Sequence, residues 1–305
     1  MTVSGREQRA SLPGLSADEA AALARRHRLE QVGVRPPFGR YVGELWQRRQ
    51  FLLTMAQGDF LAGHQNNYLG LLWSVLNPLL LGLAYLLIFG FLLDTSGDVD
   101  NFIAFLTIGL FTFLFVSVAL NYASRSIVDK TSLVRALRFP RVVLPLSVVL
   151  TQLISTVPAF LILVVIALST GERPTWEWVL FPVSVGVVGV ITAGMGLLTG
   201  RLLHEVRDSA NLIPLLIRLL RYVSGVFFPV AYFADRAVDK GAPQWVATTL
   251  EYQPIAVSLT LVRETLLGEL AVRWETWAVS LGWAVLLFGA GFVVFWRAEA
   301  TYGRT

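Results

Sequence analysis

Long stretches without a charged residue constrain the fold of this chain more than any other feature. Five of them occur: Leu69 to Leu93, Asn101 to Ser124, Val142 to Gly171, Trp178 to Gly200 and Trp277 to Trp296. Crossing roughly 30 Å of hydrocarbon takes about 20 apolar residues of α-helix. Each stretch is long enough to cross a bilayer, so we predict an all-α integral membrane protein.

The composition supports this class, and a less apolar segment adds a further span. The 305 residues are 55% hydrophobic and 15% charged, with a mean hydropathy of +0.61, which ordinary soluble domains do not need. Leu212 to Val230 is apolar except for Arg218 and Arg221, so we predict that it also crosses. The six predicted spans cover about residues 69–93, 101–124, 142–170, 178–200, 209–230 and 277–296.

The positions of Lys and Arg predict the orientation of these spans. Eighteen of the 25 lie in segments on one side of the predicted spans and five lie in segments on the other. Since the richer side is normally cytoplasmic, we predict a multi-pass protein of the cytoplasmic (inner) membrane with both termini in the cytoplasm. The net charge of +4 follows from this asymmetry, so no nucleic-acid partner is predicted. Nothing before residue 69 has the apolar core of a signal peptide, so no cleaved leader is expected.

The amino-terminal region contains a predicted amphipathic helix. The predicted parts of the chain are a polar cytoplasmic tail (1–40), an amphipathic interface helix (41–67) and a transmembrane domain (68–305). In the helix, Leu45, Leu52 and Phe60 share one face. It is too polar to span, so we expect it to lie along the inner membrane surface; the alternative is a helix packed on soluble protein. Its candidate interface residues are Trp46, Arg48 and Arg49.

The segment 222–268, before the last span, is predicted to be re-entrant or interfacial. Its apolar pieces are too short to cross a bilayer and are interrupted by Pro229, Pro243 and Pro254. We expect a helix pair on the outer side, with its irregular backbone shielded by protein or bordering water.

A short basic segment, "SIVDKTSLVRALRFPR" from Ser126 to Arg141, lies between the second and third predicted spans. Its apolar and charged positions predict an amphipathic helix over 126–139. Ser126 and Asp129 are spaced like a capping box, and Pro140 ends the helix. The segment is either a discrete handle between two spans or an ordinary positive loop that only fixes the topology.

Three blocks of sequence are similar to the membrane subunit of ABC-2 type polysaccharide exporters, a family that exports O-antigen, teichoic acid or galactan. They are "YLGLLWSVLNPLL" (Tyr68 to Leu80), "SLVRALRFPRVVLPLS" (Ser132 to Ser147) and "RDSANLIPLLIRLLRYVSGVFFPV" (Arg207 to Val230), in the family's order. The resemblance covers roughly residues 40–300 and implies that the 126–139 helix is the coupling helix, which sits in a groove of an ATP-hydrolysing subunit. The coupling residues so implied are Arg125, Asp129, Lys130, Ser132, Arg135 and Arg138.

The resemblance also implies an assembly. Two copies of the chain would pair with two copies of an ABC ATPase and, among membrane lipids, export a lipid-linked polysaccharide. The only lysines, Lys130 and Lys240, both follow an aspartate, so the chain has no phosphate loop of the GxxxxGK[ST] type. ATP and Mg would therefore be bound by the partner subunit. The residues show no catalytic constellation or metal-ligand spacing, so we predict neither an enzyme nor a metal protein.

Arg218 and Arg221 are candidate conduit residues. They are three apart and share a helical face. An arginine at mid-bilayer costs roughly 2.5 to 3.5 kcal/mol, so both should face protein or water. They either border a conduit and attract a pyrophosphate or sugar hydroxyls, or they form ion pairs or snorkel to an interface. Aromatic rings can stack on sugars, and the candidates are Trp73, Tyr222, Phe227 and Tyr232. The alternative is that these are the aromatic residues that any membrane protein places at its interfaces.

Other functions stay open at this stage. An ABC-2 permease for drugs or lipids would keep the fold and change the cargo. An ATP-independent carrier or flippase is less favoured, because the charge-free runs contain no Asp or Glu for a proton relay. A membrane glycosyltransferase should show an acidic or metal-binding cluster, and the sequence has none.

Overall fold

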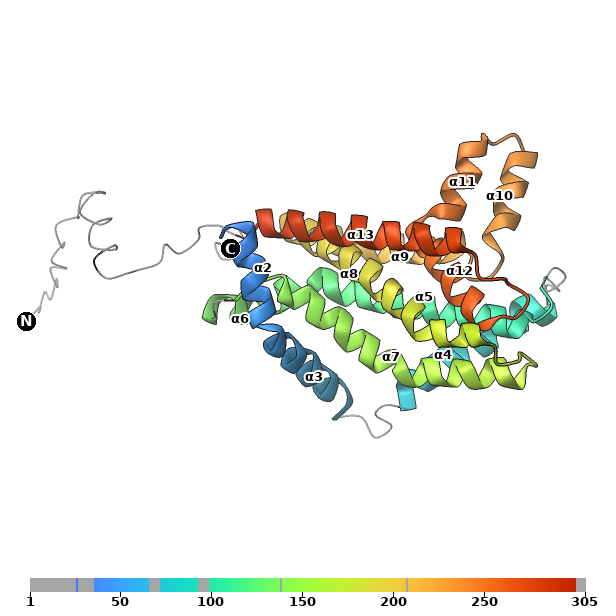
Figure 1. The fold of residues 1–305 in the computed structure, drawn as a ribbon, viewed down its shortest axis with the longest axis horizontal. Helices are drawn as coiled ribbons and strands as arrows, with labels where there is room; N and C mark the ends of the chain where they lie inside the picture. Colours follow the sequence, from blue (N-terminus) through green and yellow to red (C-terminus); the bar gives the residue numbers. More distant parts are fainter. Residues whose placement is uncertain are drawn as a thin grey trace, which may run out of the picture. The chain divides into compact units, whose positions relative to one another are not determined.

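The computed structural model describes residues 36–65, 72–92, 99–137, 139–206 and 208–299, together with Arg26. Residues 35–305 form one compact unit, and every regular element in its described part is a helix (Figure 1). The all-α prediction is confirmed. The predicted tail, 1–40, lies outside the described residues except for Arg26 and residues 36–40.

Within the described residues, five helices are long and apolar enough to cross a membrane. They are α4 (Leu72–Tyr85) with its π-helical continuation η1 (Leu86–Leu92), α5 (Phe102–Asp129), α7 (Val143–Ser169), the 3₁₀ turn η2 (Trp176–Leu180) with α8 (Phe181–Glu205), and α13 (Trp274–Arg297). These helices coincide with the five charge-free stretches of the sequence. The protein is therefore a multi-pass membrane protein. The start of the first predicted span, residues 69–71, lies outside the described residues.

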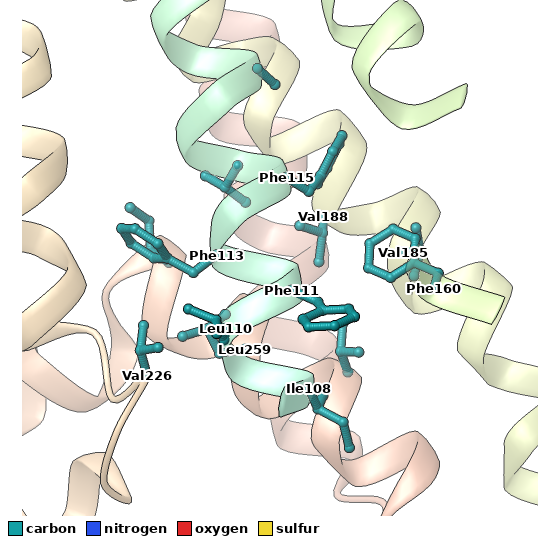
Figure 2. Packing of buried hydrophobic residues seen from close by; sticks show 14 of the residues in the cluster. Ile108, Leu110, Phe111, Phe113, Phe115, Phe160, Val185, Val188, Val226 and Leu259 are labelled. Carbon is teal, nitrogen blue, oxygen red and sulfur yellow. The ribbon is translucent and has the colours of Figure 1, made fainter. Parts of the chain in front are cut away.

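Helix α5 is the centre of this unit. It packs against α7, α8, α9 (Ser209–Val223) and α12 (Pro254–Leu266). Most of its side chains are buried; Phe111, Phe113 and Phe115, labelled in Figure 2, are each at most 2% exposed. A helix that is apolar all round is expected to be surrounded by protein, which explains why this segment has no polar face.

Helices α8 and α13 pack closely along much of their length (Figure 1). A Cβ atom on Gly194 would lie 2.4 Å from the backbone nitrogen of Phe288, and one on Gly291 would lie 2.7 Å from the carbonyl oxygen of Gly194. No side chain fits at either position. Small residues let the two backbones approach, as in other membrane helix pairs.

The fifth predicted span is shorter than expected. Helix α9 has 15 residues, about 22 Å of helix, and is not among the five helices that are long enough to cross. The chain turns after Val223 at Gly225, whose φ of +76° suits glycine. The prediction of one helix up to Val230 is wrong, because this turn ends α9 and Val230 begins the next helix.

The predicted helix pair over 222–268 is three helices in the described chain: α10 (Val230–Asp239), α11 (Gln244–Tyr252) and α12. Helices α10 and α11 form a hairpin (Figure 1), whereas α12 packs on α5, α8 and α13. The prolines that interrupt the apolar pieces, Pro229, Pro243 and Pro254, lie at helix starts, where a missing N–H costs little.

The amino-terminal amphipathic segment is also divided. A single helix over 41–67 is wrong: α2 (Phe38–Gln47) and α3 (Arg49–Gln65) are separated at Arg48. The two helices have different partners, because α2 buries Tyr41 beside the end of α13 and α3 packs on α7. Residues 66 and 67 lie outside the described chain.

Candidate functional site

The short basic helix is smaller than predicted and starts later. Ser126 to Asp129 form the last turn of α5, and the Ser126 hydroxyl donates a hydrogen bond to the Ala123 carbonyl at 2.7 Å instead of capping a helix. Helix α5 continues because Ile127 is buried in an apolar cluster with Val142. The separate helix is α6 (Thr131–Ala136), so the predicted bounds 126–139 are wrong.

A groove of about 510 Å³ lies beside α6, between the end of α5, the end of α8 and the start of α9. Arg125, Asp129 and Arg135 supply its charges, and the Arg125 guanidinium donates to the Ala210 carbonyl at 3.1 Å. Ser132 is exposed on α6. The groove therefore offers charged and apolar surface at one place. Arg138 lies outside the described residues.

Lys130, the residue immediately before α6, does not line this groove. Its ammonium forms an ion pair with the carboxylate of Asp59 on α3. Both side chains are partly shielded, with exposures of 24% and 37%. This pair ties the start of α6 to the amino-terminal helices.

A second tie lies just after α6 and centres on Glu299, which follows α13 and is 6% exposed. The Tyr41 hydroxyl of α2 donates to one carboxylate oxygen at 2.8 Å, and the Arg141 guanidinium donates to the other at 3.1 Å. Burial raises the pKa of Glu299 above its ordinary value, although Arg141 and Tyr41 act in the opposite direction. Sequence reasoning missed this residue, because nothing in its local pattern distinguishes it from other carboxylates in terminal tails.

Apolar contacts fill the space between the two ties. Val134 of α6 and Phe139 are buried in a cluster that also includes Phe51 and Leu52 of α3. The Phe51 and Phe139 rings meet edge to face, with centroids 5.2 Å apart. The segment from Lys130 to Arg141 is thus held at both ends and in its middle.

The candidate interface residues lie on the outside of α2 and at the α2–α3 junction. Trp46 is 70% exposed, and Arg49 places its guanidinium 5.2 Å from the Trp46 ring. Arg48 is exposed and forms the carboxyl-terminal cap of α2. Trp is enriched at membrane–water interfaces, and the interface role of these three residues stays a prediction.

The two arginines of α9 have different surroundings. Arg218 is exposed, whereas Arg221 donates to the Tyr85 hydroxyl at 3.3 Å and lies 5.4 Å from the centroid of the Phe113 ring. The Nε atom of Arg221 is buried without a hydrogen-bond acceptor in the described structure. The structure therefore separates two residues that the sequence treats alike.

Most of the candidate aromatic residues come together in one cluster. The buried Phe227 ring lies 4.6 Å from Tyr85, 4.9 Å from Phe89 and 5.8 Å from Tyr222. Phe89 also meets Phe228, and Phe228 lies 6.4 Å from Tyr232 of α10. We call this the aromatic ladder: Tyr85, Phe89, Tyr222, Phe227, Phe228 and Tyr232. Trp73, on α4, is 42% exposed and makes no ring contact within the described structure.

Arg263 of α12 is a buried charge that sequence reasoning did not select. It is 2% exposed, and its guanidinium donates to the carbonyls of Phe105, Gly225 and Val226 at 2.8–3.2 Å. It thereby fixes the turn that ends α9. The sequence signal that could have identified this residue is an arginine within a short apolar segment.

No group of three or more metal-ligating side chains occurs in the part of the chain that the structure describes.

Comparisons with known proteins give the family. A family model described as "ABC-2 type transporter" matches residues 50–238. An "O-antigen export system permease protein RfbA" from Myxococcus xanthus is 31% identical over 198 residues, 65% of this chain and 75% of that protein. Two proteins of the same name from Klebsiella pneumoniae are 26% identical; the alignments cover 80% and 70% of this chain and 90% and 78% of the relatives.

The helices define a multi-pass membrane protein, and the relatives are transport permeases. The chain belongs to the ABC-2 type transporter family. The resemblance drawn from the three sequence blocks is confirmed.

Proposed function

We propose that this chain is the membrane-spanning half of an ATP-driven exporter that moves a lipid-linked polysaccharide, or a similar cell-envelope glycan, across the cytoplasmic membrane. The relatives are O-antigen export permeases, which supports this cargo. Two copies of the chain surround a conduit, and each binds one copy of a separate ABC ATPase, which holds ATP and Mg. Both termini and α6 face the cytoplasm.

The observation that supports the proposal most directly is how neighbouring helices hold α6 in place. It is a short helix with exposed Ser132 and Arg135, beside a groove. Its flanks are tied to other helices through Lys130–Asp59 and Arg141–Glu299. A loop that only fixed the topology would need none of these ties, whereas a helix pushed by a partner must transmit force without bending away.

The conduit is proposed to run along Arg218, Tyr222 and the other exposed members of the aromatic ladder. Tyr222 is 60% exposed and Tyr232 is 36% exposed, so their rings are accessible to a passing sugar. Phe227, at 2% exposure, supports these rings from behind.

The test is reconstitution. The chain is purified together with a candidate ABC ATPase from the same organism and placed in vesicles, and ATP hydrolysis and the transfer of lipid-linked glycan are measured. We expect hydrolysis that rises when the glycan is present, and transfer that requires ATP. Transfer without any ATPase, or transfer of drugs or simple lipids in preference to glycan, would contradict the proposal.

A further inference from the structure

A cavity of about 420 Å³ lies at the end of the helix bundle opposite α6, between α12 and the start of α10. We propose that it is a binding site for a neutral sugar residue. The inference rests on the proposed function, because it gives the exported glycan a holding point beyond the aromatic ladder. The ladder leads to it: Pro229, Val230 and Ala231 line the cavity and connect Phe228 with Tyr232.

Two buried residues of opposite charge that are adjacent in the sequence line the cavity. They are Arg263, which is 2% exposed, and Glu264, which is 1% exposed. Glu264 is satisfied, since Arg273 donates to it at 2.9 Å and the Thr276 hydroxyl at 2.7 Å. Arg263 makes no such pair within the described residues; its hydrogen bonds go to three carbonyls. The Nε, Nη1 and Nη2 atoms of Arg263 each donate already, and its guanidinium carbon lies 3.5 Å from the centroid of the Phe105 ring, so Arg263 shapes the cavity wall. Arg273 also lines the cavity, is exposed, and uses only its Nε and backbone N–H on Glu264, so its terminal N–H donors remain for a ligand.

Acceptors face the same cavity. Glu251, at the end of α11, lines it with a half-buried carboxylate. The Thr260 hydroxyl lines it as well and donates to the Ala256 carbonyl at 3.1 Å, so its oxygen can still accept. The cavity therefore presents donors and acceptors together.

Apolar groups form most of the remaining wall. Phe105, Tyr252, Val257 and Leu267 line the cavity. A pyranose has hydroxyl groups that both donate and accept, and it has C–H faces that pack on apolar and aromatic surface. The volume lies in the range of small-molecule sites.

Other ligand classes fit this lining less well. An acyl chain would remove the water from Glu251 and Arg273 without replacing their hydrogen bonds, which is costly. The groups that stay free are of both signs: an anion would meet the Glu251 carboxylate, and a cation would meet the exposed guanidinium of Arg273. A neutral polyol is the class that leaves neither kind of group unpaired.

The site opens to the surface, because Ala231 and Ala271 line it and are exposed. Its lining includes Pro229, which directly precedes α10, and the first residues of α10, Val230 and Ala231. A sugar bound there would contact α12 and the start of α10 together. The bound sugar would therefore contact α10, the helix that the polymer passes as it leaves.

The experiment measures binding to the purified permease–ATPase complex by titration calorimetry. The probe is a mixture of neutral oligosaccharides released from the strain's own envelope glycan by mild acid, compared with methyl glucuronide as an anion. Ala231→Trp fills the cavity, and Thr260→Val removes a hydroxyl while keeping the shape. Thr248→Val, on the exposed face of α11 outside the cavity, is the matched control.

We expect the wild type and Thr248→Val to bind the neutral oligosaccharides equally, and both cavity variants to bind them at least several-fold more weakly. Equal binding by Ala231→Trp and the wild type, or tighter binding of methyl glucuronide, would overturn the inference. If Ala231→Trp does not fold, Thr260→Val decides in the same way. Failure of the proposed function is distinguishable, because it would appear as loss of ATP-dependent glycan transfer by the wild type.

Discussion

Gly109 of α5 and Arg263 of α12 fit against each other so closely that position 109 has no room for a side chain. A Cβ atom on Gly109 would lie 2.1 Å from Nη2 of Arg263 and 3.0 Å from the Val226 carbonyl oxygen. The guanidinium of Arg263 occupies the space that a side chain at position 109 would take. A glycine in the middle of an apolar span is thus explained by a contact more than a hundred residues away in the sequence.

Gly109→Ala should destabilise the protein. The added methyl group must displace Arg263 from the carbonyls of Phe105, Gly225 and Val226, and buried polar groups left unpaired cost about 1–3 kcal/mol. The measurement is thermal unfolding in detergent. Gly186→Ala in α8, where an added Cβ meets nothing within 4 Å, is the control and should be neutral or slightly stabilising. Equal melting temperatures for Gly109→Ala and the wild type would refute this packing.

Gly194→Ala should separate α8 from α13. The new methyl group would overlap the backbone of Leu287 and Phe288, and overpacking of this kind typically costs about 1–3 kcal/mol. Gly289→Ala on α13 has open space around it and serves as the control. The expected result is a lower melting temperature and a lower yield of monodisperse protein for Gly194→Ala alone. Similar behaviour of the two variants would argue against the close α8–α13 contact.

Stability should depend on pH through Glu299. Burial raises its pKa above the ordinary value of 4.5, so the folded protein favours the protonated carboxyl more than the unfolded chain does. The stabilising contribution is therefore complete below pH 4.5 and is lost as the pH rises through the folded-state pKa. Glu299→Gln cannot ionise, so its melting temperature should vary less between pH 4.5 and neutral pH. Parallel profiles for the two proteins would show that Glu299 titrates normally.

Arg218→Ala and Arg221→Ala should differ. Arg218 is exposed on α9, so its removal should lower glycan transfer several-fold and leave the melting temperature unchanged. Arg221 binds the Tyr85 hydroxyl, so its removal should lower both. Tyr85→Phe, which keeps the ring and removes the hydroxyl, should lower the melting temperature less than Arg221→Ala. Normal transfer by a folded Arg218→Ala protein would end the proposed conduit role of this residue.

The sequence predicted the long helices well because each depends on local properties. A charge-free stretch such as Asn101 to Ser124 has only one stable arrangement in hydrocarbon, and helix α5 follows it. The end of that helix could not be predicted. Ser126 and Asp129 have the sequence spacing of a capping box, but burial of Ile127 beside Val142 keeps α5 helical for another turn.

The candidate site was predicted in part for a related reason. The basic character of Arg125 and Arg135 is visible in the sequence, and both line the groove beside α6. The partners that hold this helix are distant: Asp59 pairs with Lys130 across 71 positions, and Glu299 with Arg141 across 158. Contacts of this kind have no periodicity, so a single sequence does not reveal them.

The central claim is that the chain has no ATP-hydrolysing machinery of its own and receives force through α6. Because the chain contains no cysteine, Ser132→Cys gives a single reactive thiol on the exposed face of α6, and Thr248→Cys on α11 gives a matched thiol at the opposite end. Each variant is labelled with a thiol-reactive photo-cross-linker in vesicles that contain the ATPase and turn over ATP. The account predicts a permease–ATPase adduct from Ser132→Cys and none from Thr248→Cys. Absence of the adduct at Ser132→Cys during active turnover would contradict it.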